Sequence, residues 1–337
     1  MILDIFLTDI RNLMEVMIDY TPYKLLDWID PKRLDPENLS LNPRATYFLD
    51  TNPDKIVWEI LTANENAISL LEQNIEKIRR IDWFHLSENP NALPLLEQNI
   101  QKIDWISLSI NPQAIHLLEK YPDKIDWTHL SRNPQAIQLL EKYPDKIYWR
   151  YLSANPNALH LLEKNLEKID WELLSGNPNA IYLLEQNRKK IDWYILSRNP
   201  NALPLLEQNI EKIDWTMLSR NPNGTHLLEK NPEKIYWRYF SANPEAIHFL
   251  EKNLERVDWS YLSANPNAIH ILKKNPDKIN WFRFSWNQAI FQVDYQALKT
   301  RIELFKEELI ARCFHPDRLI RYLDLYQYDI GDDEYQD

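Results

Sequence analysis

Ten tryptophans stand 22 residues apart along most of this chain, without a slip in spacing. They are Trp83, Trp105, Trp127, Trp149, Trp171, Trp193, Trp215, Trp237, Trp259 and Trp281. A period of this length is typical of a repeat array, in which each unit is too small to bury its own apolar face and must pack on its neighbours. The length of 337 residues would suggest about two domains, but the repeats override that estimate.

Two less regular units precede these ten. Trp58 lies 25 residues before Trp83, and the three extra residues fall in the stretch KIRRIDW. Pro36 lies 22 residues before Trp58 and takes the place of the tryptophan. We therefore expect about twelve units between residues 33 and 286.

The first half of each unit, I-D-W-x-x-L-S, predicts a short helix. Asp126 is a good N-cap, and Trp127 shares a helix face with Leu130 three positions later. Pro36 supports this prediction because proline fits the first turn of a helix.

The second half, N-P-x-A-I-x-L-L-E-K, predicts a helix of about ten residues. Asn133 is a suitable N-cap, Pro134 suits the first helical position, and apolar residues recur with helical spacing over 136–140. Pro94 and Pro204 fall inside the predicted helix, so those two units are expected to be distorted or to start the helix late. The segment N-P-D-K-I that follows predicts a single turn.

These elements predict an all-α fold, an elongated and curved α-solenoid of about twelve two-helix repeats. A leucine-rich repeat would also suit a period of 22, but its strand needs an apolar column where this chain carries Arg150 and Glu172. The tryptophans, leucines, alanines and isoleucines are expected to form the stacking core. A fully buried tryptophan contributes roughly 4–6 kcal/mol as an upper bound.

Four segments are predicted along the chain. Residues 1–32 form an N-terminal cap, 33–286 the solenoid, 287–328 a C-terminal helical cap and 329–337 an acidic tail. Open solenoid ends need covers with a polar outer side, which is the role expected of both caps.

Composition narrows the function. Cys313 is the only cysteine, which fits a reducing compartment, and the N-terminal stretch lacks the basic region of a signal peptide. No apolar run is long enough to span a membrane. The net charge of −11 opposes binding to nucleic acid or anionic membrane. We expect a cytoplasmic protein with no membrane association, more often a monomer than an oligomer.

The titratable residues form columns and give no sign of an enzyme. Five histidines occupy one repeat position, at His116, His160, His226, His248 and His270. Equivalent positions on stacked helices lie about 8–10 Å apart, too far to share a zinc ion held at about 2 Å. Glutamates and lysines also repeat, as solvated ridges do. We predict no catalytic residue, no metal and no cofactor. A basic lysine column leaves single-stranded RNA binding as a less favoured alternative.

Partner choice is expected to depend on positions where the repeats differ. Two units read YWRYLSANP and YWRYFSANP, and a third adds a tyrosine in DWSYLSANP. We hypothesise a protein-binding face that includes Tyr148, Arg150, Tyr151, Tyr236, Arg238, Tyr239 and Tyr261, since Tyr and Arg dominate binding hot spots. The alternatives are ordinary surface variation and tyrosines packed between neighbouring units.

The phrase KIDWxxLSxNPxAIxLLEKNPDKI resembles short tryptophan-containing repeats of proteins encoded by giant DNA viruses of amoebae. The segment ELIARCFHPDRLIRYLD is similar to a C-terminal signature of such proteins, and the resemblance covers roughly residues 36–325. It implies an interaction module and no catalytic residue. We expect a non-catalytic protein-interaction scaffold in the host cytoplasm, or alternatively a self-assembling structural component of the virion.

Overall fold

The computed structural model describes residues 21–79, 82–300 and 303. The chain divides into two compact units, one formed by Leu25–Phe291 and the other by Met1–Lys24 together with Gln292–Asp337. All the repeats lie in the first unit. Most of the predicted caps and the whole acidic tail lie outside the described residues, although residues 295–300 are helical where the C-terminal cap was predicted.

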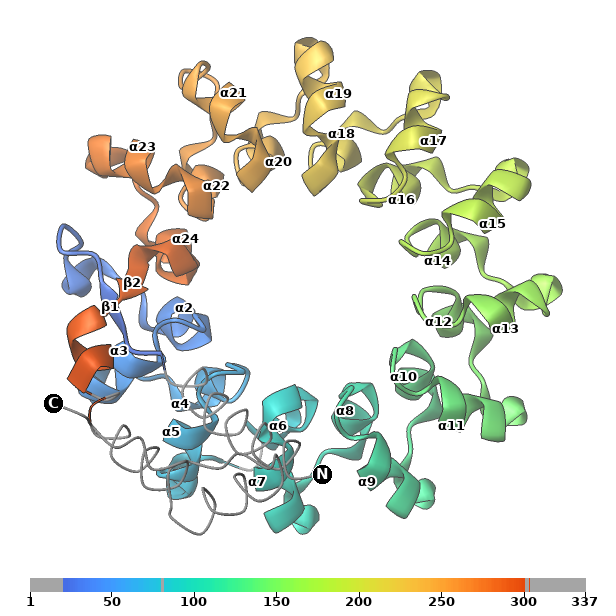
Figure 1. Cartoon of the computed structure of the whole chain (residues 1–337), viewed down its shortest axis with the longest axis horizontal. Helices are drawn as coiled ribbons and strands as arrows, with labels where there is room; N and C mark the ends of the chain where they lie inside the picture. The colour runs from blue at the N-terminus through green and yellow to red at the C-terminus, as the bar shows by residue number, and fades with distance from the viewer. Residues whose placement is uncertain (1–20, 80–81, 301–302, 304–337) are drawn as a thin grey trace, which may run out of the picture. The chain divides into compact units, whose positions relative to one another are not determined.

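Each of the twelve repeats begins with a short helix that starts at the repeat tryptophan or, in the first repeat, at Pro36. These helices form the inner row in Figure 1. They are α2 (Pro36–Leu41), α4 (Trp58–Leu61), α6 (Trp83–Glu88), α8 (Trp105–Ile110), α10 (Trp127–Arg132), α12 (Trp149–Ser153), α14 (Trp171–Ser175), α16 (Trp193–Arg198), α18 (Trp215–Leu218), α20 (Trp237–Phe240), α22 (Trp259–Leu262) and α24 (Trp281–Trp286). The predicted all-α repeat fold is confirmed.

The second helix of each repeat lies in the outer row of Figure 1. These helices are α3 (Thr46–Thr51), α5 (Ile68–Glu72), α7 (Leu93–Gln98), α9 (Ile115–Lys120), α11 (Ile137–Lys142), α13 (Leu159–Glu163), α15 (Ile181–Gln186), α17 (Leu203–Glu207), α19 (Thr225–Lys230), α21 (Ile247–Glu251) and α23 (Ile269–Lys274). The last repeat continues instead into a 3₁₀ turn and a strand.

The outer helices are shorter than the predicted ten residues. The side chain of Asn133 accepts a hydrogen bond from the backbone N–H of Gln135 at 3.0 Å, which holds the Asn-Pro segment in a turn of its own. The α-helix therefore begins only at Ile137. This late start also accommodates Pro94 and Pro204, which fall in the first turn of α7 and α17, where proline is tolerated.

Short 3₁₀ turns connect the helices. Those that follow outer helices are η2 (Pro53–Lys55), η3 (Ile75–Lys77), η6 (Ile100–Lys102), η7 (Pro122–Lys124), η8 (Pro144–Lys146), η9 (Leu166–Lys168), η10 (Arg188–Lys190), η11 (Ile210–Lys212), η13 (Pro232–Lys234) and η16 (Pro276–Lys278). Those in the Asn-Pro position are η5 (Pro90–Ala92), η12 (Pro222–Gly224), η14 (Pro244–Ala246), η15 (Pro266–Ala268) and η17 (Gln288–Ile290), and η1 (Pro31–Arg33) precedes the first repeat. Strands β1 (Tyr23–Leu25) and β2 (Phe291–Val293) pair in a two-stranded sheet.

The core runs between the two rows of helices. In the repeat of α10, Leu130, Ala136 and Leu140 are fully buried, and the equivalent residues recur in the other repeats. The tryptophans are less buried than this core: only Trp83 is nearly inaccessible, and the other nine keep part of the ring exposed. A lysine or arginine often covers that ring, as Lys190 does at 4.4 Å from the Trp171 centroid. Their burial therefore contributes less than the upper bound for a fully buried ring.

An unbroken asparagine ladder joins the repeats. At all twelve junctions, the side-chain amide of one asparagine per repeat donates to the backbone carbonyl of the equivalent Asn in the preceding repeat of the ring. This asparagine precedes the repeat proline in all units except those of Asn64 and Asn287. The ladder consists of Asn42, Asn64, Asn89, Asn111, Asn133, Asn155, Asn177, Asn199, Asn221, Asn243, Asn265 and Asn287. These residues are buried, so the bonds fix each repeat on its neighbour and leave few polar groups unsatisfied.

A serine bond forms a second link between repeats. The hydroxyl of Ser109 donates to the carbonyl of Trp105 in its own repeat at 2.8 Å. It also accepts a bond from the backbone N–H of Asp126 in the next repeat at 3.0 Å. The same acceptor bond recurs at eleven junctions. The exception lies between α4 and α6, where Thr62 takes the place of the serine.

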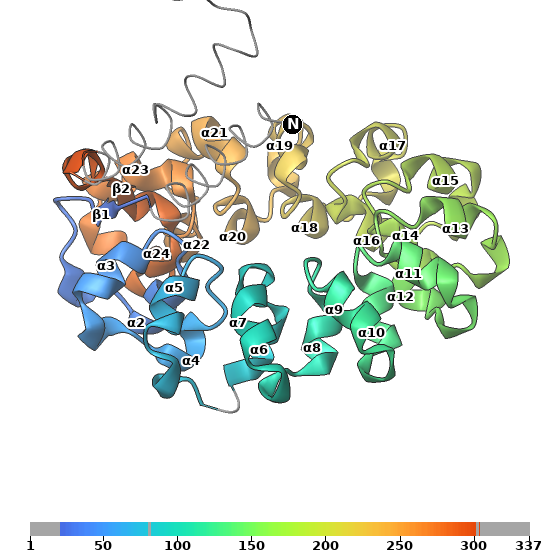
Figure 2. The same cartoon turned by 60° about the horizontal axis from the view of Figure 1, so that its bottom comes forward.

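The compact unit Leu25–Phe291 closes on itself as a ring, unlike the elongated, open-ended solenoid expected from the sequence. Asn42 donates to the carbonyls of Ser285 and Asn287 at 3.0 and 3.2 Å, and Asp35 N–H donates to the Ser285 hydroxyl at 2.7 Å. Helices α2 and α24 accordingly lie side by side in Figures 1 and 2. The first and last repeats of this unit therefore cover each other.

Candidate partner-binding face

The exposed face of the inner helices is formed by the first and fifth positions after the tryptophan. These positions lie one turn apart on a helix and so share a face. In α10, Arg132 occupies the fifth position and is exposed, whereas Leu130 and Ser131 are buried toward the outer helix and the neighbouring repeats. Because the packed side faces the outer row, the exposed side faces the interior of the ring in Figure 1.

The predicted Arg-Tyr residues fall into two separate groups on this inner row. Tyr148, Arg150 and Tyr151 belong to the repeat of α12, which lies four repeats before that of α20. The structure does not bring this group together with the second one. Arg150 instead approaches the Asp170 carboxylate of the next repeat, at 3.7 Å.

The second group forms an arginine–tyrosine cluster that runs over four consecutive inner helices, α18 to α24. It comprises Arg220, Tyr236, Arg238, Tyr239, Tyr261 and Arg283. The guanidinium of Arg220 lies 3.6 Å from the ring centroid of Tyr239, which meets the Tyr261 ring edge-on at 5.7 Å. Arg238 and Arg283 lie 5.0 and 4.1 Å from the Tyr261 centroid. Arg220 and Arg238 thus reach the tyrosine of the next repeat, whereas Arg283 reaches back to that of the preceding one.

Cation–π contacts of this kind are worth about 0.5–1 kcal/mol each at exposed sites, and together they hold long side chains in place. Tyr236 also packs against Tyr239, with ring centroids 5.1 Å apart. Tyr239 and Tyr261 therefore pack between neighbouring repeats, as one of the alternatives from the sequence expected. The tyrosines serve as a platform, and Arg220 and Arg238 remain exposed on it.

The cluster carries positive charge without a local counterion. In the described part of the chain, no carboxylate forms an ion pair with Arg220, Arg238 or Arg283. Arg283 instead donates from Nε to the Ser260 hydroxyl at 3.2 Å. The hydroxyl of Tyr261 raises the pKa of Arg238 above its usual value.

Sequence reasoning missed Arg220 and Arg283. Arg220 follows a serine, five positions after its tryptophan, and Arg283 lies two positions after its own. Neither arginine is followed by a tyrosine, so inspection of single repeats does not indicate that these arginines belong to the binding face. A helical-wheel comparison of neighbouring repeats would place the fifth position of one repeat beside the second position of the next.

Apolar side chains continue the exposed inner face beyond the cluster. On α24, Phe282 and Trp286 are 57% and 52% exposed, and they occupy the first and fifth positions. Ring closure places α2 next to α24, and Leu41 on α2 is 36% exposed at the same fifth position. Large apolar side chains are seldom left exposed together on a protein surface that has no partner.

The histidine column lies on the outer helices. Three of its members contact a glutamate of the preceding repeat: His116 with Glu97, His160 with Glu141 and His270 with Glu251. The hydrogen bond from His270 lowers the pKa of Glu251. These pairs link exposed ridges of neighbouring repeats. Within residues 21–79, 82–300 and 303 there is no group of three or more side chains suited to hold a metal ion.

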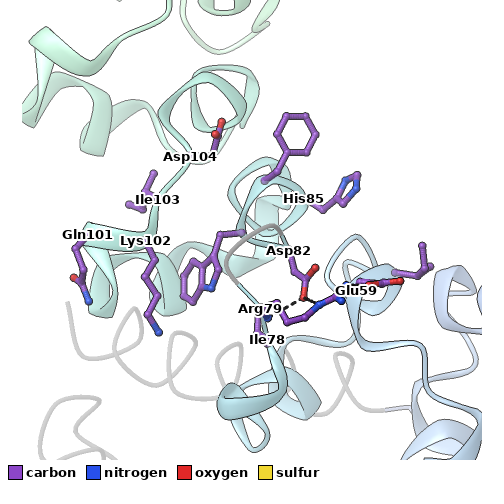
Figure 3. Close-up of a pocket in the computed structure, with 12 residues that line it drawn as sticks. Glu59, Ile78, Arg79, Asp82, His85, Gln101, Lys102, Ile103 and Asp104 are labelled. Atoms are coloured by element: carbon purple, nitrogen blue, oxygen red, sulfur yellow. Dashed lines mark hydrogen bonds and ion pairs between the residues drawn. The ribbon is translucent and has the colours of Figure 1, made fainter.

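A pocket of about 1240 Å³ lies at the irregular junction between α4 and α6 (Figure 3). Asp82 is its one buried acid, and its carboxylate accepts a hydrogen bond from the backbone N–H of Arg79 at 2.8 Å. The side chain of Arg79 pairs with Glu59 and approaches Asp82. The charges of Arg79, Glu59 and Asp82 thus satisfy one another (Figure 3), and the pocket offers less for a partner than the cluster does.

No helix in the described ranges is both long and apolar enough to cross a membrane. The sequence matches no protein-family model, and comparisons with curated proteins and with solved structures find no match. The function is therefore argued from the geometry of the inner face.

Proposed function

We propose that this protein is a non-catalytic scaffold that binds another protein on the inner face of its ring of repeats. The observation that carries the proposal is the arginine–tyrosine cluster, in which Arg220 and Arg238 are exposed on half-buried, preordered tyrosines and the arginines have no acidic partner among the described residues. Preordered side chains lose little conformational freedom on binding, and Tyr and Arg are the residues enriched in binding hot spots. From the resemblance to viral repeat proteins, we further propose that this role is exercised in the cytoplasm of an infected host.

Ring closure also favours a binding role over self-assembly. An open solenoid exposes the apolar and hydrogen-bonding surface of its end repeats, which other copies can extend. Here the hydrogen-bonding groups of Asn42 and Ser285 join the first repeat to the last repeat of the same chain. Growth of a fibre through the repeat ends would require these bonds to break first.

Affinity capture tests the proposal. The immobilised protein is exposed to amoebal lysate with and without nuclease, beside a double variant, Arg238→Ala with Tyr239→Ala. We expect a small set of proteins to be retained despite nuclease and to be lost, by tenfold or more, with the variant. Arg150→Ala with Tyr151→Ala is the matched control, because it changes the same two residue types in nearly the same local sequence.

Circular dichroism melting curves must show that all variants remain folded. Equal retention by the wild type and the cluster variant would contradict the proposal. Retention that disappears with nuclease would point to RNA instead, and recovery of only the protein itself would support a self-assembling component.

A further inference from the structure

We infer that the partner presents an acidic segment flanked by apolar residues, which lies in extended form along the inner face from α18 across α24 to α2. This inference rests on the proposed function and specifies the chemistry of its partner. It follows from charge complementarity at the arginine–tyrosine cluster and from the apolar side chains that adjoin it across the ring closure.

The charge argument starts from the three arginines. Arg220 contacts the ring of Tyr239, and Arg238 and Arg283 both contact the ring of Tyr261. None of the three has an acidic partner among the described residues. Carboxylates match the planar donor fork of a guanidinium, and such pairs are among the stronger hydrogen bonds in proteins. A row of acidic side chains would therefore satisfy the exposed Arg220 and Arg238 and the half-buried Arg283, which are already positioned.

The apolar argument concerns the end of the cluster. Arg283 shares α24 with Phe282 and Trp286, and Leu41 follows on α2. A partner that covered only the arginines would leave these side chains in water. A segment that adds apolar residues next to its acids would bury both kinds of surface at once.

The dimensions favour an extended segment. Five inner helices at about 8–10 Å spacing span roughly 35 Å, which about 11 extended residues cover at ~3.3 Å each. A short linear segment of a partner is long enough to follow this path.

Nucleic acid is a poorer match to the same face. Glu59, Glu88 and Glu172 occupy exposed first or fifth positions of inner helices outside this path, and Glu37 occupies the exposed first position of α2 at its end. A phosphate backbone that continued around the ring would meet these carboxylates. Arg132 and Arg198 are also exposed at fifth positions, but among the described residues arginines contact tyrosine rings only in the arc from α18 to α24. This local grouping suits a short acidic segment better than a long polyanion.

Fluorescence anisotropy with synthetic probes tests the inference. The first probe is a fluorescein-labelled peptide of about 12 residues, with a glutamate-rich centre and a Leu-Phe pair at each end. Three further probes replace the glutamates by lysine, replace the apolar pairs by serine, or consist of a uridine oligoribonucleotide. The full chain is titrated with each probe.

We expect the acidic peptide with apolar ends to bind, and to bind at least tenfold more weakly to the Arg220→Gln, Arg238→Gln variant. The Phe282→Ser, Trp286→Ser variant should weaken it several-fold but should leave the serine-ended peptide unaffected. The Arg150→Gln variant, which removes an arginine already close to Asp170, should bind as the wild type does.

Several results would overturn the inference: no binding of the acidic peptide, equal binding by the Arg220→Gln, Arg238→Gln variant, equal binding of the lysine peptide, or tighter binding of the oligoribonucleotide at the same arginines. If lysate proteins are retained through the cluster while the acidic peptide does not bind, the proposed scaffold function stands and the inferred partner chemistry is wrong.

Discussion

The ring contains two unusual junctions, one between α24 and α2 and one between α4 and α6. At the first, Asp35 and Ser285 lie 250 positions apart in the chain, yet they form the same bond that links consecutive repeats elsewhere. Asn42 makes both bonds of the asparagine ladder to the last repeat. Arg33 adds a guanidinium 4.0 Å from the Trp281 ring centroid.

At the second junction the repeats are neighbours in sequence but lack one of these links. Thr62 turns its hydroxyl back to the Glu59 carbonyl at 2.7 Å. The backbone N–H of Asp82 bonds to the Arg79 carbonyl, within the three-residue insertion, and no serine hydroxyl receives it. Only the asparagine ladder continues, with Asn89 donating to Thr62 and Asn64 at 3.2 Å.

The comparison shows that continuity of the ring depends on repeat register and not on chain connection. The closing junction is complete because both ends keep the register of 22 residues relative to their own neighbours. The inserted junction is incomplete because three extra residues move the next helix start away from its acceptor. A covalent link between neighbouring repeats does not replace the missing bond.

The largest expected effect comes from removing both links at the closing junction. Asn42→Ala with Ser285→Ala deletes two ladder bonds and leaves the Asp35 N–H without its acceptor, which should lower the free energy of unfolding by about 3 kcal/mol. Chemical denaturation measures the loss, and X-ray scattering should show a larger radius of gyration as the ring opens.

The matched control is Asn89→Ala with Thr62→Ala at the inserted junction. It should cost less, about 1–2 kcal/mol, because no inter-repeat bond to Thr62 exists to be lost. An equal loss for the two double variants would show that the serine bond adds nothing to the asparagine ladder.

A smaller effect is expected from restoring the register. Deleting Arg79, Arg80 and Ile81 while changing Thr62→Ser gives this junction the spacing and the hydroxyl of the others. The new hydrogen bond should raise the free energy of unfolding by about 1 kcal/mol, seen as a higher melting temperature. Thr62→Ser alone is the control and should give no gain. A deletion variant less stable than the wild type would contradict the account of this junction.

The smallest effect concerns pH at an ordinary junction. Partial burial tends to raise the pKa of Asp126, but hydrogen bonds from the backbone and imidazole of His129 outweigh it, and the net pKa is lowered. A carboxyl whose pKa is lowered on folding stabilises the fold above its unfolded pKa, and this stabilisation is lost as pH falls through the folded value.

Acid denaturation below about pH 4 should therefore be slightly reduced in Asp126→Asn, which keeps an N-cap acceptor that does not titrate. Near pH 7 this variant should be no more stable than the wild type. The melting temperature followed from pH 7 to pH 3 measures both expectations, and parallel curves would exclude a contribution from this cap.

Local signals in the sequence predicted the helices well. Asp-Trp marks the start of seven of the twelve inner helices. In six of them the aspartate caps the helix through its side chain, as Asp104 does by accepting a bond from Ser107 N–H at 2.9 Å. Asn-Pro was also interpreted as the start of a helix, but the asparagine side chain instead holds a separate turn, as Asn133 does. The bonds from this asparagine to the neighbouring repeat were not predicted, because the carbonyls that accept them lie 22 and 24 residues away in the sequence.

Ring closure could not be predicted from one repeat. Curvature is the sum of small angles at all junctions, and each angle depends on packing between residues of different repeats. Contacts between repeats also explain why only part of the binding face could be predicted. Arg238 and Tyr239 stand out within a single repeat, whereas the role of Arg220 depends on its contact with Tyr239 of the next repeat.

The closed asparagine ladder also constrains how this protein can evolve. Open repeat arrays lengthen or shorten by duplication and loss of single units, because a new unit disturbs only its neighbours. Here twelve units share one full turn, about 30° each if they contribute equally. A thirteenth unit would require every junction to rotate less or the ladder to break. We therefore expect gene rearrangements that change the copy number by one to destabilise the ring, whereas substitutions within the units leave its closure intact.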